Sequence, residues 1–296
     1  KIVNDIALMN AVGYYKLGTE NNQAISASVR YFSIGDVNLT DQFGEMTNTI
    51  APYEMAIDLG YSRKLTETFS GSVAVRYIRA DYSGADEEGS PGSTFAADIA
   101  GYNESYLNIG RSESLLSFGF NISNIGGKIS NNDGTTSSFI PTNMRIGASL
   151  MYPMSEVSTL SFSLDANKLL VPTPPTREHS GDKFNEDMAK YLEGNSISGI
   201  FKSFNDAPGG FSEELKEISW SAGVEYDYDS KFKVRTGYFN ENKMKGNRQY
   251  FTFGAGFKMN AFQLDASYLL STASTNPLDQ TLRFSLTFDI DALARL

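Results

Sequence analysis

Cysteine is absent from this sequence, which excludes disulfide bonds, thiolate nucleophiles and cysteine-based metal sites. No apolar run reaches the roughly 18 residues that a membrane-spanning helix needs, so no such helix is predicted. Basic residues are in the minority, with 25 Lys and Arg against 35 Asp and Glu. The resulting net charge of -10 argues against a nucleic-acid partner.

Candidates for catalytic or metal-binding chemistry are also few. His179 is the only histidine, so a Ser-His-Asp site would have to use it. It lies in a proline-rich segment rather than on a predicted strand, and we interpret it as structural. The sequence Asn131–Thr135 resembles the start of a calcium loop, but Thr142 stands at the twelfth position, where such a loop has glutamate. We therefore expect no enzyme activity, no metal site and no cofactor.

Alternation of apolar and polar residues is the most extensive pattern in the chain. It is clearest from Glu217 to Ile290, where five predicted strands follow one another closely. The apolar residues of the last of these strands are Leu282, Phe284, Leu286, Phe288 and Ile290, each separated from the next by a polar residue. A period of two places the apolar and polar sets on opposite faces of a sheet.

The length of the alternating segments distinguishes between two all-β folds. They run for about 10–14 residues, whereas soluble strands average about 5–6 and a tilted strand needs about 9–11 to cross a bilayer. Aromatic residues gather toward the strand ends, as at a membrane interface. The mean hydropathy of -0.29 fits a barrel, because lumen and loop residues dilute the lipid-facing set. We predict an all-β fold, a transmembrane antiparallel β-barrel, with a large soluble all-β protein as the alternative.

The order of the connections supports the barrel. We predict thirteen strands, at 3–17, 23–37, 52–65, 68–82, 95–109, 114–124, 141–153, 157–171, 216–228, 231–241, 248–258, 261–272 and 279–290. Short turns alternate with longer loops throughout, as in outer-membrane barrels with short periplasmic turns and longer outside loops. We therefore expect a single barrel domain over residues 1–296, in contact with outer-membrane lipid and lipopolysaccharide.

Thirteen is an odd number, whereas single-chain bacterial barrels have an even number of strands and both termini in the periplasm. The short connection at Gly18 places Lys1 on the outside, which requires a further strand before it. We therefore expect fourteen strands, with one strand, and a plug if there is one, upstream of Lys1. The first residues, Lys1–Asp5, do not have the apolar core of a signal peptide.

The long outside loop at 172–215 differs from the other loops. It starts with the stiff segment Pro172–Thr176, and after Gly181 the apolar period changes from 2 to about 3.6. We predict two short helices, the first starting near Asp182 and the second with Ser196 as its N-cap. Their apolar faces supply our candidate partner-binding residues, which are Phe184, Met188, Tyr191, Leu192, Ile197, Ile200, Phe201 and Phe204. Either these side chains are buried over the barrel mouth, or they meet a partner or a ligand.

Charged residues on the polar phase of the strands form a second group of candidates. They are Arg30, Arg76, Arg145, Asp165, Glu225, Arg235, Asp265 and Arg283. One interpretation is that they pair with one another and make the interior rigid. The other is that they line a polar permeation path through the lumen.

Blocks along the whole chain carry a family resemblance. They are Val3–Ile6, Gly13–Leu17, Gln23–Gly35, Thr94–Asp98, Asn121–Gly126 and Asp165–Pro175. In this order and spacing they resemble the PorV family of the type IX secretion system of Bacteroidota. None of the blocks is a catalytic signature. The PorV family is similar to the FadL family of fourteen-stranded barrels, which agrees with the strand count.

The resemblance implies a role in protein secretion without catalysis. A protein of this family would associate with the giant translocon barrel SprA, also called Sov, and collect cargo with a C-terminal signal domain. It would then deliver the cargo to the cell-surface attachment complex that contains the PorU sortase. The resemblance also implies an N-terminal plug, which we expect upstream of Lys1.

Two other functions compete with this one. A FadL-like transporter of hydrophobic small molecules would need an apolar pocket that leads to a lateral gap in the wall. An outer-membrane enzyme such as a deacylase would depend on His179.

Overall fold

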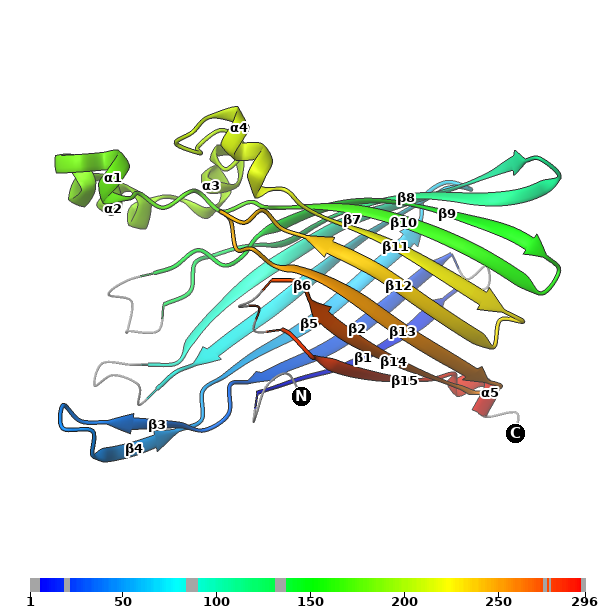
Figure 1. Ribbon diagram of the computed structural model, residues 1–296, viewed down its shortest axis with the longest axis horizontal. Helices are drawn as coiled ribbons and strands as arrows, with labels where there is room; N and C mark the ends of the chain where they lie inside the picture. The colour runs from blue at the N-terminus through cyan, green and yellow to red at the C-terminus, as the bar shows by residue number, and fades with distance from the viewer. Residues whose placement is uncertain are drawn as a thin grey trace.

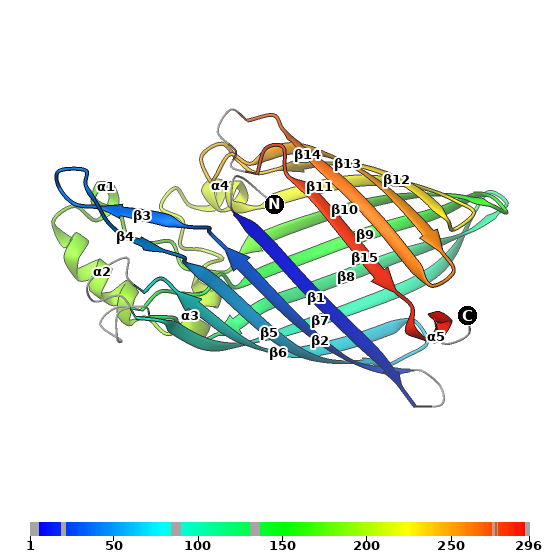
Figure 2. The ribbon, with the colours of Figure 1, turned by 90° about the horizontal axis from the view of Figure 1, so that it is seen from below.

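The computed structural model is a single large antiparallel sheet that curves into a barrel-shaped wall (Figure 1, Figure 2). Most of the helices and a small hairpin project from one end of this wall, which we call the outer end. A short helix, α5 (Ile290–Leu293), lies at the other end. The described residues are 6–18, 22–83, 90–130, 137–273, 276 and 278–293. No helix in this part of the chain is long and apolar enough to cross a membrane.

The wall contains thirteen strands that pair in chain order. They are β1 (Ala7–Leu17), β2 (Gln23–Ser33), β5 (Tyr53–Lys64), β6 (Phe69–Asp81), β7 (Gly92–Ile109), β8 (Ser112–Gly126), β9 (Asn143–Ser155), β10 (Ser158–Leu169), β11 (Ser219–Tyr228), β12 (Phe232–Asn240), β13 (Gln249–Met259), β14 (Phe262–Ser271) and β15 (Leu282–Phe288). The prediction of thirteen antiparallel strands is confirmed. The larger boundary differences are at the end of β2, predicted at 37, and at the starts of β7, β11 and β15, predicted at 95, 216 and 279. The predicted start of the first strand, residue 3, lies outside the described residues.

A hairpin was missed in the predicted loop at 38–51. It consists of β3 (Val37–Thr40) and β4 (Met46–Ile50), which pair only with each other. At its tip, the Asp41 carboxylate accepts hydrogen bonds from the backbone N–H groups of Phe43 (2.8 Å) and Glu45 (2.9 Å). This turn presents the Phe43 ring to solvent, where it is 81% exposed.

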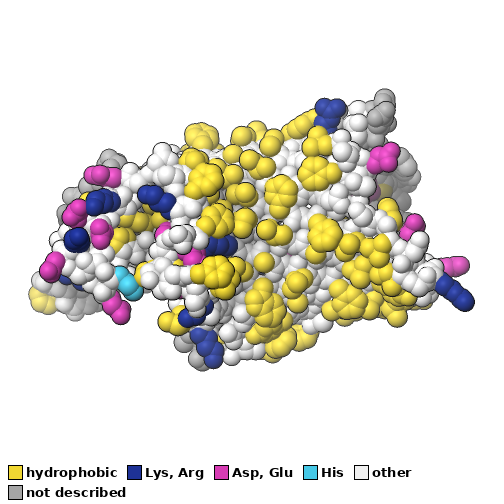
Figure 3. All heavy atoms as spheres, turned by 90° about the horizontal axis from the view of Figure 1, so that it is seen from above, with side chains coloured by type: hydrophobic (Ala, Val, Ile, Leu, Met, Phe, Trp, Pro, Cys, Tyr) yellow, Lys and Arg dark blue, Asp and Glu magenta, His cyan; other side chains and the backbone are white. Residues whose placement is uncertain are grey.

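Side chains of the wall are distributed in the opposite way to those of a soluble core. In β11, Trp220, Val224 and Tyr226 are exposed, whereas the polar residues between them are partly buried. The same outward exposure of apolar side chains recurs on the neighbouring strands. Figure 3 shows one outer face, where hydrophobic side chains cover the wall and most charged ones gather toward its two ends. This is the distribution that a lipid-facing band requires.

β1 and β15 are the first and last strands of the sheet. Each strand is antiparallel to the next along an order of thirteen, so β1 and β15 run in the same direction. A strand placed between them could be antiparallel to both. The fourteenth strand stays a prediction.

Gly126 lies where β8 leaves the wall, and it offers a test of the β7–β8 register. A Cβ atom there would overlap the backbone of Phe95 and Ala96, so Gly126→Ala should destabilise the barrel by about 1–3 kcal/mol. Gly13→Ala is the matched control, because no other atom lies within 4 Å of its Cβ position. The temperature at which the folded band disappears in heat-modifiability gels measures the effect. If the folded band disappears at the same temperature in both variants, the register between β7 and β8 is contradicted.

Candidate partner-binding surface at the outer end

The segment between β10 and β11 carries four short helices. They are α1 (Arg177–Ser180), α2 (Phe184–Glu193), α3 (Ser196–Lys202) and α4 (Phe211–Glu214), with 3-10 turns η1 (Gly181–Lys183) and η2 (Leu215–Glu217). α2 and α3 are the two predicted helices. The predicted N-cap is wrong: Asn195 caps α3, because its Oδ1 accepts a hydrogen bond from the backbone N–H of Ile197 at 2.8 Å. Ser196 is the first residue of the helix.

Part of the predicted apolar surface makes contacts within the protein. The ring of Tyr191 packs edge-on against Phe139, with ring centroids 5.2 Å apart. Lys128 Nζ lies 4.1 Å from the centroid of the same Phe139 ring. The guanidinium carbon of Arg177 lies 5.0 Å from the centroid of the Phe184 ring. The β8–β9 loop therefore supports α2, a role that the sequence analysis missed.

The remaining predicted residues divide by exposure. Met188 and Ile200 are partly buried, whereas those exposed to solvent are Leu192, Ile197, Phe201 and Phe204. Phe201 is the most open of them, at 74%. Two further exposed apolar residues, Phe211 and Leu215, were missed because α4 and η2 are too short to show a helical period.

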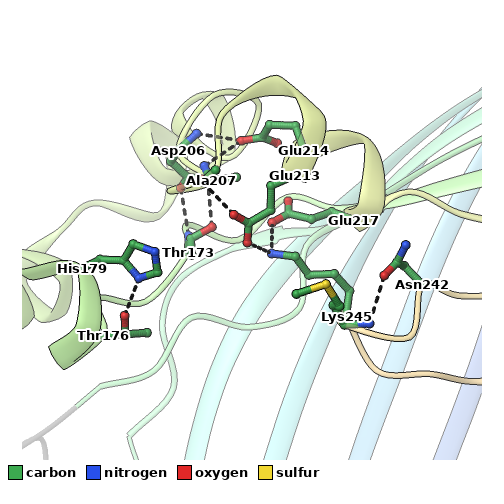
Figure 4. Close-up of polar contacts among 12 residues, drawn as sticks. Thr173, Thr176, His179, Asp206, Ala207, Glu213, Glu214, Glu217, Asn242 and Lys245 are labelled. Carbon is green, nitrogen blue, oxygen red and sulfur yellow. Dashed lines mark hydrogen bonds and ion pairs between the residues drawn. The ribbon is translucent and has the colours of Figure 1, made fainter.

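Five charged residues hold this segment to the wall, and we call them the rim cluster: Lys168, Glu213, Glu214, Glu217 and Lys245. Lys168 Nζ donates to Glu214 Oε2 at 2.8 Å and to Glu217 Oε2 at 2.7 Å. Lys245 Nζ, from the β12–β13 loop, donates to Glu213 Oε1 at 2.6 Å and to Glu217 Oε1 at 3.0 Å. Lys168 and Glu214 are buried. Figure 4 shows Glu213 and Glu217 converging on Lys245.

The glutamates of the rim cluster also fix the chain before α4. Glu214 Oε1 accepts hydrogen bonds from the backbone N–H groups of Asp206 (2.8 Å) and Ala207 (2.9 Å). The Asp206 carboxylate in turn accepts from the N–H of Thr173 at 2.9 Å. The start and the end of the long loop are thereby joined to one ionic centre, which makes the loop a fixed platform over the rim.

The rim cluster should make the position of the loop depend on pH. The Lys245 hydrogen bond lowers the pKa of Glu213 below its ordinary 4.5. Burial favours protonation of Glu214, but hydrogen bonds from Lys168 and two backbone N–H groups outweigh it and also lower the pKa of Glu214. A lowered carboxylate pKa contributes stability above the ordinary pKa, and this contribution is lost as the pH falls through the lowered value.

We therefore expect the platform to be held at neutral pH and released below pH 4.5. Hydrogen exchange of the amides of residues 205–217, compared with those of the wall strands, measures the release. A loss of protection confined to 205–217 in acid, after correction for the intrinsic pH dependence of exchange, is the expected result. Equal protection at neutral and acid pH would contradict the role of the rim cluster.

His179 lies on α1 and is exposed. Its Nδ1 shares a hydrogen bond with Thr176 Oγ1 at 2.8 Å. The described part of the chain contains no group of three or more His, Cys, Asp or Glu side chains placed to hold a metal ion. Asn131–Thr135 lies outside that part, and the hydroxyl of Thr142 donates to the backbone oxygen of Asn124 at 2.6 Å.

The lumen-facing charges divide into paired and unpaired groups. Arg76 pairs with Asp58 and, at 2.9 Å, with Asp98. Arg235 pairs with Glu225 and, at 2.7 Å, with Asp265. The interpretation of mutual pairing thus holds for half of the predicted set, and Asp58 and Asp98 were missed as partners.

Four of the predicted lumen charges form no ion pair with another described residue: Arg30, Arg145, Asp165 and Arg283. Two hollows of about 360 Å³ and 550 Å³ lie beside two of them. Both are lined by Arg145, Ser149, Ser163 and Asp165. The interior along this part of the wall therefore carries charged and small polar side chains among apolar and aromatic ones.

Comparison with known proteins identifies the family. The family model described as "Type IX secretion system protein PorV" matches residues 1–176. The chain belongs to the PorV family. It is accordingly an outer-membrane component of the type IX secretion system, as the resemblance predicted. The match ends just before α1, so the helices of the platform lie beyond it.

Similarity to a solved structure was also found. The crystal structure of the Pseudomonas putida toluene transporter TodX is similar to this PorV-family chain, with 9% sequence identity and a TM-score of 0.47. The similarity covers 95% of this chain and 84% of TodX. A search of curated proteins found no match.

Proposed function

We propose that this PorV-family barrel is a non-enzymatic adaptor of type IX secretion. It binds the SprA (Sov) translocon, receives cargo proteins with a C-terminal signal domain, and passes them to the attachment complex that contains PorU. The supporting observation is the exposed apolar face of α3, with Ile197 and Phe201, and Phe204 just after it, on a platform that ion pairs fix to the rim. Rigid, exposed aromatic side chains are the residues that dominate binding energy at protein interfaces.

Features of the lumen favour the adaptor over a transporter of hydrophobic small molecules. A transporter of that kind needs an apolar path, because most of a bound ligand's surface meets the pocket wall. The two hollows in the wall combine apolar and aromatic residues with the charged side chains of Arg145 and Asp165, so charged groups interrupt their apolar surface. The apolar surface of the protein lies on the platform and on the lipid-facing wall.

The test is affinity purification of the tagged protein from its native membrane in mild detergent, followed by mass spectrometry. We expect a very large barrel protein and secreted proteins that share a C-terminal domain to be recovered with it. An unrelated barrel, tagged and purified in the same way, is the control for non-specific capture. Recovery of the chain alone, with lipid or fatty acid bound, would instead support a transporter.

A further inference from the structure

Lys168 occupies an unexpected position on the wall. Because side chains alternate along a strand, Lys168 is on the same, outward-facing side of β10 as the exposed residues Phe162 and Leu164. A lysine in this row would face lipid, yet Lys168 is buried. Its cover is α4 and η2, which supply Glu214 and Glu217. The α4–η2 segment therefore covers Lys168 at the outer end of β10, and Figure 1 shows α4 near the outer ends of the strands.

Aromatic side chains mark the level of the membrane interface just below this segment. Trp220 lies opposite Ala166, one outward position below Lys168. The rings of Trp220 and Tyr238 are 5.7 Å apart, and those of Tyr238 and Phe251 are 4.8 Å apart. An outward aromatic row at the end of barrel strands sits at the headgroup level of the leaflet. The α4–η2 segment is directly above that row.

Exposed apolar side chains lie next to the rim cluster in the chain at this level. Phe211 and Leu215 are four residues apart and share one side of the α4–η2 segment, whereas Glu213 and Glu217 share the other. Phe211 is 75% exposed and Leu215 is also exposed. Met244, next to Lys245 in the β12–β13 loop, is 78% exposed.

We propose that Phe211, Leu215 and Met244 form a lipid-contacting foot that rests in the headgroup region of the outer leaflet. The foot extends the lipid-facing surface upward past the aromatic row, beyond the rim cluster. Apolar side chains on one side and charges on the other are the arrangement of segments that lie in a membrane interface. The rim cluster keeps the charges against the protein while the apolar side chains enter the boundary with the acyl chains. The foot then sets the height of α1–α3 above the membrane.

Tryptophan fluorescence can test the foot, because Trp220 is the only tryptophan of the chain. Phe211→Trp and Met244→Trp are each made together with Trp220→Phe. The proteins are reconstituted in vesicles of phosphatidylcholine and lipopolysaccharide, with or without bromine on the upper part of the phosphatidylcholine acyl chains. Phe43→Trp, in the same background, is the control at the tip of the hairpin. The unsubstituted protein, with Trp220 in the aromatic row, is the positive reference.

We expect bromine to quench the tryptophans at 211 and 244 at least about half as strongly as it quenches Trp220, and to leave the tryptophan at 43 unquenched. If the tryptophans at 211 and 244 are quenched no more than that at 43 while Trp220 is quenched, the lipid contact is refuted. The patch would then be open for contact with a protein. Met244 lies outside the helices, so its variant gives a result even if Phe211→Trp disturbs α4.

Discussion

Replacing Phe201 by alanine is expected to weaken binding to the translocon by at least about 2 kcal/mol, or roughly 30-fold in affinity. The Phe201 ring is 74% exposed, so its truncation removes little from the folded monomer. Its backbone is held in α3, which Asn195 caps, so the side chain loses little freedom on binding. A larger loss is expected when Ile197 and Phe204 are replaced as well. The measurement is the amount of translocon recovered with each variant at equal barrel concentration.

Phe43→Ala is the matched control for this prediction. Phe43 is the same residue type at 81% exposure, at the outer end but on the hairpin and not on the helices. We expect it to leave recovery of the translocon unchanged. If Phe43→Ala weakens recovery as much as Phe201→Ala does, the binding surface is not specific to α3. Unchanged recovery with the triple variant would refute the assignment of this surface.

The barrel wall could be predicted because its signal is local. Most wall strands repeat the two-residue period long enough to span a bilayer, and β11 and β14 show this in their sequences. The β3–β4 hairpin was missed because strands of four and five residues contain only two repeats of the period. Val37 pairs with Ile50 in this hairpin. The sequence of one strand does not show which residue of the other strand it will pair with.

At the outer end, the two helices could be predicted from the sequence, but the contacts that their side chains make could not. The apolar period of α2 and α3 is local, but what each face meets is decided by distant residues. Tyr191 is turned inward by Phe139 from another loop. Glu214 meets Lys168, 46 positions earlier in the chain. One signal was available: a lysine on the apolar phase of a lipid-facing strand requires an acidic cover, and three glutamates follow at 213–217.

Lys168→Met is expected to release the platform from the rim. The substitution leaves Glu214 and Glu217 without their shared cation, and removing one partner of a buried ion pair costs about 3–5 kcal/mol. The amides of Asp206 and Ala207, which Glu214 also holds, should then exchange hydrogen far faster. Lys190→Met is the matched control, because the Lys190–Glu186 pair is 67% and 64% exposed. Such an exposed pair contributes little to stability because solvent screens it, so exchange at 206 and 207 should not change.

A compensating variant separates the loss of charge balance from the loss of the lysine side chain. Lys168→Met combined with Glu214→Gln and Glu217→Gln removes the uncompensated buried charge, and a glutamine oxygen at 214 can still accept from the two amides. We expect this triple variant to recover most of the protection that Lys168→Met loses. If the amides of Asp206 and Ala207 exchange as fast in the triple variant as in Lys168→Met, the packing of the lysine side chain, and not its charge, holds residues 205–217 in place. Recovery would mean that the platform is fixed by neutralising charge on the lipid side of the wall, where an unpaired ion is least tolerated.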